Sequence, residues 1–127
     1  MGGRHAFCVA GRFRDRVKAT ARIHGTALIK QGADSPHLMA RAGSGEIYCG
    51  HAQRDKYAPA DVVEKLDRGF AGAGVRYHYA LHRGAEHAYA IPDREVYDDR
   101  AANHDWREIF AMFGRQLRAR VAGEDRR

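Results

Sequence analysis

The chain has 127 residues, of which 44% are hydrophobic and 30% are charged, and its formal net charge is +6. This length suits one ordinary domain, and this balance excludes a disordered chain. No apolar run approaches the roughly 18 residues needed to span a bilayer, and Met1 to His5 lead into no signal-peptide core, so we expect a cytoplasmic protein with no membrane partner.

The positive charge is concentrated near the N-terminus. Residues 1–30 hold seven Lys and Arg side chains against Asp15 alone, whereas the rest of the chain holds 15 positive and 15 negative side chains. A basic patch can bind nucleic acid. However, the only aromatic residues in this segment are Phe7 and Phe13, and no nucleic-acid-binding motif is present, so a solvated surface explains the charge equally well. We expect no nucleic-acid partner.

The first half of the chain predicts one helix and two strands. Residues 3–13 have apolar positions that are typical of a short helix, and residues 17–24 alternate imperfectly, as in a strand. Residues 31–45 are rich in Gly, Ser and Pro and predict a loop. Residues 46–50 predict a short strand bounded by glycines, which runs into a polar loop at residues 51–55.

The second half predicts a helix, a strand and a final helix. The first of these helices opens at Pro59 and ends at Gly72, with apolar residues at helical spacing between them. Residues 75–81 predict a third strand, and residues 83–86 predict a turn. Residues 103–121 predict the last helix. Its apolar stripe, which we expect to cover the sheet, consists of Trp106, Ile109, Phe110, Phe113 and Leu117.

This order of elements predicts an α/β fold of about three parallel strands with flanking helices. Parallel sheets are normally covered by helices on both faces. About three helices are expected here, and one sheet edge has no obvious cover. The pattern therefore indicates that part of the fold is missing.

Two reactive side chains follow the predicted strands. Asp55 comes after the second strand and His87 after the third, where α/β folds place reactive groups. An acid followed by a histidine is the second half of the nucleophile–acid–histidine order found in α/β-hydrolases. In such a triad the imidazole takes the proton of the nucleophile and the carboxylate holds the imidazole in the right tautomer. By position alone, the interpretation that both are ordinary loop residues is favoured over the catalytic one.

Two segments resemble the dienelactone hydrolase family of α/β-hydrolases. Residues 46–59, which read Glu-Ile-Tyr-Cys-Gly-His-Ala and then contain Asp55, resemble its acid segment. Residues 79–90, with Gly-Ala-Glu-His-Ala-Tyr around His87, resemble its histidine segment, usually written as Gly-Ala-x-His-Gly-Phe. The similarity covers about residues 1–120, which is nearly the whole chain. It implies a partial α/β-hydrolase fold.

The same resemblance implies that the nucleophile is missing. The family's nucleophile elbow reads Gly-x-Cys (or Ser)-Met-Gly-Gly-Arg or close to it, and this chain begins Met-Gly-Gly-Arg. Met1 then stands right after the nucleophile, and the nucleophile and the earlier strands are absent. Cys8 is a poor substitute, because an elbow needs a preceding strand and only seven residues precede Cys8. A buried helix cysteine is the better interpretation, and we expect Cys8 and Cys49 to be free thiols.

The resemblance implies hydrolysis of a small-molecule carboxylic ester or lactone. His87 would act as general base and then as acid, and Asp55 would orient it. Residues 1–127 would be the C-terminal part of a single α/β-hydrolase domain, inactive as written, and no cofactor is implied. In the family, an arginine four residues after the histidine usually binds the carboxylate of the dienelactone, and here that position is Ile91. An intact parent protein can therefore act on a different ester or lactone.

Two other classes of function stay open: a non-catalytic remnant or interaction module, and, less favoured, a basic nucleic-acid-binding protein. The DNA upstream of the first codon discriminates between these classes, because an in-frame elbow would show that the start is assigned too late.

We expect no metal site, because His78 and His82 on one strand are about 13 Å apart. The strand at residues 17–23 lacks a neighbour, so we expect self-association through an open sheet edge.

Overall fold

The computed structural model describes residues 1–118. In chain order, its elements are α1 (Gly2–Arg12), β1 (Ala19–Ile23), α2 (Pro36–Arg41), β2 (Glu46–Arg54), α3 (Ala60–Gly72), β3 (Tyr77–Glu86) and α4 (Asp99–Leu117). The strands form one parallel sheet in the order β1-β2-β3. The predicted sheet of three parallel strands is therefore confirmed, and within the described residues β1 pairs on one side only.

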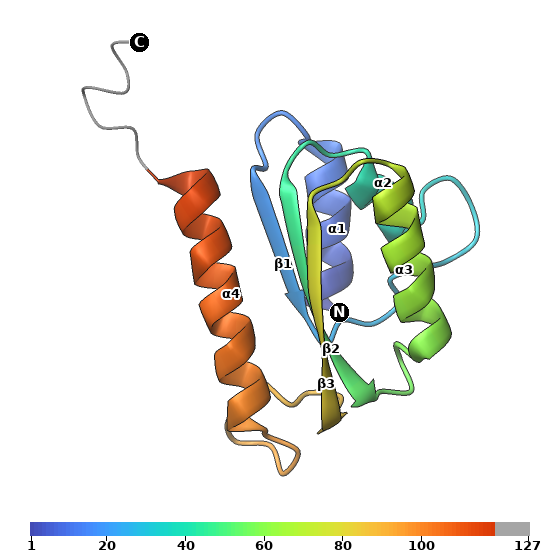
Figure 1. The fold of residues 1–127 in the computed structure, drawn as a ribbon. Coiled ribbons are helices and arrows are strands. Elements are labelled where there is room, and N and C mark those ends of the chain that lie inside the picture. The colour runs from blue at the N-terminus through green and yellow to red at the C-terminus, as the bar shows by residue number, and fades with distance from the viewer. Residues whose placement is uncertain (119–127) are drawn as a thin grey trace.

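Helices cover both faces of the sheet, with α1, α2 and α3 on one face and α4 on the other (Figure 1). Successive side chains of β2 point to opposite faces. Cys49 therefore packs with Phe7 of α1 and Phe70 of α3, whereas Tyr48 packs with Ile109 of α4. Fully burying one such side chain stabilises the fold by roughly 1.5–3 kcal/mol, so these two clusters hold the three layers together.

Two strands extend further than the sequence pattern predicts. Residues 51–54, expected in a loop, continue β2, and residues 83–86, expected as a turn, continue β3. Pairing between the two strands continues through a shift of register, after which Arg54 pairs with Glu86. A β-bulge bends the strand that carries it. From His82 to Glu86, β3 advances four residues while β2 advances only two, from Ala52 to Arg54, so the irregularity lies in β3, directly before His87.

The predicted loop over residues 31–45 is wrong in its middle, where α2 lies. Pro36 is a loop signal in sequence, but its fixed φ suits the first turn of a helix, and here it takes that place. The short helix packs closely on α1 because Gly11 has no side chain. A Cβ at Gly11 would overlap the backbone of Met39.

The predicted apolar stripe of the last helix is wrong at three of its five positions, whereas Ile109 and Phe113 do pack against the sheet. Trp106, Phe110 and Leu117 are 44%, 66% and 54% exposed, Phe113 is partly buried, and only Ile109 is fully buried. The face that lies on the sheet consists of Ala101, Ala102, Asp105, Ile109 and Met112. A buried carboxylate and two alanines weaken the apolar pattern on this face, which explains the error.

The bounds of the last helix differ as well. It begins at Asp99, because the Asp98 side chain caps it by accepting from the Ala101 N–H at 3.1 Å. The predicted end at residue 121 lies outside the described residues. Within residues 1–118, no helix combines the length and the apolar character that crossing a bilayer requires.

Candidate active site

Asp55 and His87 meet at the carboxyl edge of the sheet. Asp55 directly follows β2 and His87 directly follows β3, and the carboxyl ends of parallel strands share one edge. His87 Nδ1 lies 2.8 Å from Asp55 Oδ2. Because a carboxylate can only accept, Nδ1 carries the proton in this contact and Nε2 of the neutral ring keeps its lone pair. The arrangement gives an imidazole whose free nitrogen can accept a proton.

The carboxylate is fixed more firmly than the imidazole. The Asp55 side chain is 1% exposed, and its Oδ1 accepts from the Tyr57 N–H at 2.8 Å. The His87 side chain is 29% exposed. Its ring centre lies 4.8 Å from that of Tyr57 and 5.3 Å from that of His24. One ring nitrogen is thus held by a buried anion while the ring remains reachable from solvent.

Two non-glycine residues near His87 have left-handed backbone conformations. His24 has φ of 39° and Ala88 has φ of 76°. Such a conformation costs an L-residue roughly 1–2 kcal/mol and persists where the surroundings hold it, often at functional sites. Ala88 stands at the glycine position of the histidine-segment pattern. Burial, and then the nearby His87, lowers the pKa of His24, which therefore stays neutral near pH 7.

A cavity of about 440 Å³ adjoins His87. The start of α1, residues 1–3, lines it together with Ile91 and Arg94. A helix N-terminus presents unpaired N–H groups and a partial positive charge. A carbonyl group bound in the cavity would therefore have an imidazole and hydrogen-bond donors within its reach. No serine, threonine or cysteine is among the described residues that line this cavity.

The structure does not bring a cysteine to His87. Cys8 is a partly buried residue inside α1, where the residues on both sides of it are helical, and it lines a different cavity beside Pro36. Cys49 is fully buried in β2, and burial raises the pKa of its thiol to about 11. Both thiols are free. The interpretation of Cys8 as a helix residue rather than a nucleophile agrees with this placement.

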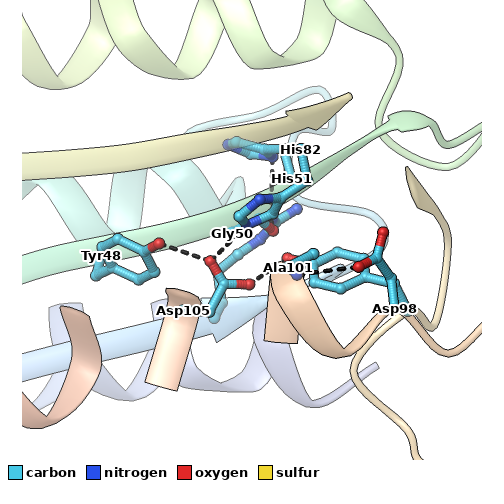
Figure 2. Close-up of polar contacts among 9 residues, drawn as sticks. Tyr48, Gly50, His51, His82, Asp98, Ala101 and Asp105 are labelled. Carbon is cyan, nitrogen blue, oxygen red and sulfur yellow. Dashed lines mark hydrogen bonds and ion pairs between the residues drawn. The ribbon is translucent and has the colours of Figure 1, made fainter. Parts of the chain in front are cut away.

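A second carboxylate–imidazole pair, which the sequence analysis missed, lies on the α4 face of the sheet (Figure 2). Asp105 of α4 is fully buried, and its Oδ1 lies 2.7 Å from His82 Nε2. The Tyr48 hydroxyl donates to Oδ1 at 2.6 Å, and the Tyr89 hydroxyl donates to Oδ2. Burial opposes the charge, but these three hydrogen bonds keep the pKa of Asp105 below its ordinary value.

Within the described part of the chain, the hydroxyl groups that contact this second pair belong to two tyrosines. Burial and then Asp105 raise the pKa values of Tyr48 and Tyr89, so both hydroxyls remain protonated donors. His78 lies near the opposite end of β3, where it contacts Glu46 at 3.1 Å, so it shares no ligand with His82. Within residues 1–118, no three potential metal ligands gather at one point.

A buried arginine joins β1 to β2 under the same edge. Arg22 donates to the carbonyls of Gly50 at 2.7 Å and Gly25 at 3.1 Å, and it lies 3.0 Å from His51 Nδ1. Because arginine only donates, His51 Nδ1 accepts. Burial, followed by the charge of Arg22, lowers the pKa of His51 to about 3, so this histidine is a neutral structural residue.

Comparisons with known proteins agree on one fold. The sequence matches the dienelactone hydrolase family over residues 1–117. No curated protein matches it significantly. A Klebsiella pneumoniae protein classed as a dienelactone hydrolase superposes with a TM-score of 0.78 and 21% identity, over 88% of this chain and 48% of that one. The apo form of Thermogutta terrifontis esterase 2 superposes with a TM-score of 0.71 and 16% identity, over 90% of this chain and 52% of the esterase chain.

Both structures contain, within a longer chain, the three parallel strands and flanking helices described above. The chain therefore has a partial α/β-hydrolase fold and spans about half the length of these two relatives. At these identities the structural likeness shows the fold alone.

Proposed function

The chain belongs to the dienelactone hydrolase family, and we propose that Asp55 and His87 are the acid and the histidine of a triad that hydrolyses carboxylic esters or lactones. The observation that carries this proposal is the 2.8 Å contact between His87 Nδ1 and Asp55 Oδ2. It leaves Nε2 free, beside a cavity that the start of α1 also lines. These are the features that a general base needs in order to activate a nucleophile.

The proposed reaction has two steps. A cysteine or serine attacks the carbonyl carbon while His87 Nε2 takes its proton, and Asp55 stabilises the charged ring. The bond to the leaving oxygen then breaks, and that oxygen takes the proton from His87, which leaves an acyl-enzyme. Water next attacks the acyl carbon with His87 again as base. The nucleophile regains its proton and the carboxylic acid is released.

We further propose that the 127 residues correspond to the C-terminal portion of the hydrolase domain and that the nucleophile belongs directly before Met1. Two observations support this placement. Met1 and His87 line the same cavity. In addition, the chain covers 48% of the Klebsiella pneumoniae structure and 52% of the esterase structure. On this proposal, the 127-residue polypeptide itself forms no acyl-enzyme.

An appended cysteine tests the placement. The variant carries Gly-Ala-Cys before Met1 and has Cys8→Ala, so the other thiol is Cys49, which burial makes unreactive. A thiol beside a histidine has a pKa several units below the usual value of about 8.5. A lower pKa raises the fraction of thiolate at pH 6.5 but also makes each thiolate a weaker nucleophile. Taking both effects together, we expect alkylation by iodoacetamide at pH 6.5 to be roughly fivefold to tenfold faster than in the same variant with His87→Ala.

Matched variants control for general effects. Asp55→Asn should lose most of the acceleration, whereas Asp61→Asn, at an exposed acid of α3, and His104→Ala, on α4, should keep it. If the alkylation rate and its pH profile are the same with and without His87, a nucleophile before Met1 does not lie beside this histidine, and the proposal is wrong.

A further inference from the structure

The turn that carries His87 is anchored two residues later by Tyr89. Tyr89 is fully buried, and its hydroxyl donates to Asp105 Oδ2 on α4. Its backbone closes the turn, because its N–H donates to the Glu86 carbonyl at 3.1 Å and its carbonyl accepts from the Asp98 N–H at 2.9 Å. The Tyr89 side chain therefore ties the segment that contains His87 to α4, the helix that follows it in the chain.

Asp105 is itself held in place from three directions. Besides Tyr89, it accepts from Tyr48 on β2 and contacts His82 on β3 (Figure 2). Asp105 lies against the backbone of β2 at Gly50, which has no side chain. A Cβ at this position would overlap both the Asp105 carboxylate and the Tyr89 hydroxyl. The carboxylate is thus a fixed point between β2, β3 and α4, to which the Tyr89 hydroxyl is attached.

Packing and backbone conformation connect this point to His87. The ring centre of Tyr89 lies 5.2 Å from that of His24, which in turn lies 5.3 Å from that of His87. Between His87 and Tyr89, Ala88 has φ of 76°, a conformation that an L-residue leaves when nothing holds it. If Tyr89 were released, rotation about Ala88 would turn His87 away from Asp55.

We propose that Asp105 is a positioning residue for His87 and acts through the Tyr89 hydroxyl. Asp105 keeps the turn in the conformation that brings His87 Nδ1 to Asp55. The catalytic meaning of this role rests on the proposed function, whereas the positioning itself concerns only the contact between Asp55 and His87.

A matched pair of variants tests the route. Tyr89→Phe and Tyr48→Phe each remove one hydroxyl donated to Asp105, but only Tyr89 lies on the His87 turn. Nitrogen NMR spectra of the 127-residue chain, labelled at its histidines, report which ring nitrogen of His87 is protonated. We expect Tyr89→Phe to lower the ratio of the Nδ1–H form to the Nε2–H form of His87 by about tenfold. The loss of one hydrogen bond to a carboxylate is large enough to shift an equilibrium by this factor. Tyr48→Phe should leave the ratio unchanged.

A second pair separates positioning from general loosening of α4. Glu46 is another buried carboxylate that ties α4 to the sheet, through Arg115 at 2.5 Å. Asp105→Asn should shift the His87 ratio as Tyr89→Phe does, and Glu46→Gln should not. If Asp105→Asn fails to fold, the two tyrosine variants still decide. The readout is local to one ring, so it holds whether the chain is monomeric or self-associated.

The outcomes also separate the two proposals. Asp55→Asn must change the His87 ratio if the Asp55–His87 pair exists, and no change there would refute the proposed function. If Asp55→Asn changes the ratio but Tyr89→Phe leaves it at the wild-type value, the pair stands and positioning by Asp105 is refuted. Equal shifts in Tyr89→Phe and Tyr48→Phe would also refute it, because they would show an unspecific effect.

Discussion

Replacing Gly50 by alanine should lower the free energy of unfolding by about 2–5 kcal/mol. The added methyl group would overlap the carboxylate of Asp105 and the hydroxyl of Tyr89, and both of these side chains are fully buried. Overpacking of this kind costs roughly 1–3 kcal/mol. Displacing the carboxylate also weakens at least one hydrogen bond to it, worth about 1.5–3 kcal/mol. Removing a strand glycine returns only about 0.5–1 kcal/mol.

Urea denaturation at low protein concentration measures this effect. Gly114→Ala in α4 is the matched control, because a Cβ there meets no atom within 4 Å. It should raise the free energy of unfolding by about 0.5–1 kcal/mol, since alanine is the better helix residue. The packing described over Gly50 is refuted if Gly50→Ala unfolds with a free energy within about 0.5 kcal/mol of the parent chain, a difference too small for any of these effects.

Four further changes have defined outcomes. The 127-residue chain should hydrolyse p-nitrophenyl acetate no faster than its His87→Ala variant, because no serine, threonine or cysteine is among the residues within 1–118 that line the His87 cavity; a product burst that Cys8→Ala abolishes would contradict this. Ala88→Gly should raise the free energy of unfolding by about 0.5–1 kcal/mol, as relief of the left-handed strain exceeds the entropy of glycine in the unfolded chain; urea denaturation would show no gain if the turn were unstrained. The unfolded state binds a proton at His51 with a pKa of about 6.5, but the folded state binds it only at a pKa of about 3, so stability should fall as pH drops between these values by up to about 1.4 kcal/mol per unit. His51→Gln should flatten this dependence of the free energy of unfolding on pH, measured by urea denaturation at several pH values. An unchanged slope would show that groups other than His51 cause it. Finally, the His24 N–H and the Lys18 carbonyl pair with β2, so the alternation of a parallel ladder turns the Ala21 N–H toward the open side of β1; Ala21→Pro should therefore reduce self-association of the chain in size-exclusion chromatography, and a parent chain that is already monomeric would contradict the open-edge prediction.

The sheet could be predicted because its signals are local. Alternation in β1 and short apolar runs in β2 and β3 place three strands, and the α/β order makes them parallel. The ends of β2 and β3 could not be predicted, because polar residues such as His51 and Gln53 are typical of loops. Their place in the strand depends on pairing with β3, as when His51 pairs with Leu81, and the Gln53 side-chain oxygen adds a bond from the Gly84 N–H at 2.8 Å.

The candidate site was predictable only in part. The Asp55–His87 contact follows from two residues placed at the ends of adjacent strands, which sequence spacing can indicate. Asp105 gives no such signal, because a single acid within a helix is normally on the solvent side. Its burial depends on donors from distant positions, Tyr48, His82 and Tyr89. For the same reason, the sequence pattern included the exposed residues Trp106, Phe110 and Leu117 in the face of α4 that covers the sheet.

Acyl transfer tests the assignment of Asp55 and His87 most directly. The chain extended by Gly-Ala-Cys before Met1, with Cys8→Ala, is mixed with p-nitrophenyl acetate, and mass spectrometry locates the acetyl group. We predict rapid acetylation of the appended cysteine, slowed about a hundredfold or more by His87→Ala, which is the usual contribution of a general base. Acetylation at the same rate without His87, or none above that of the unextended chain, would contradict the hydrolase assignment of this pair.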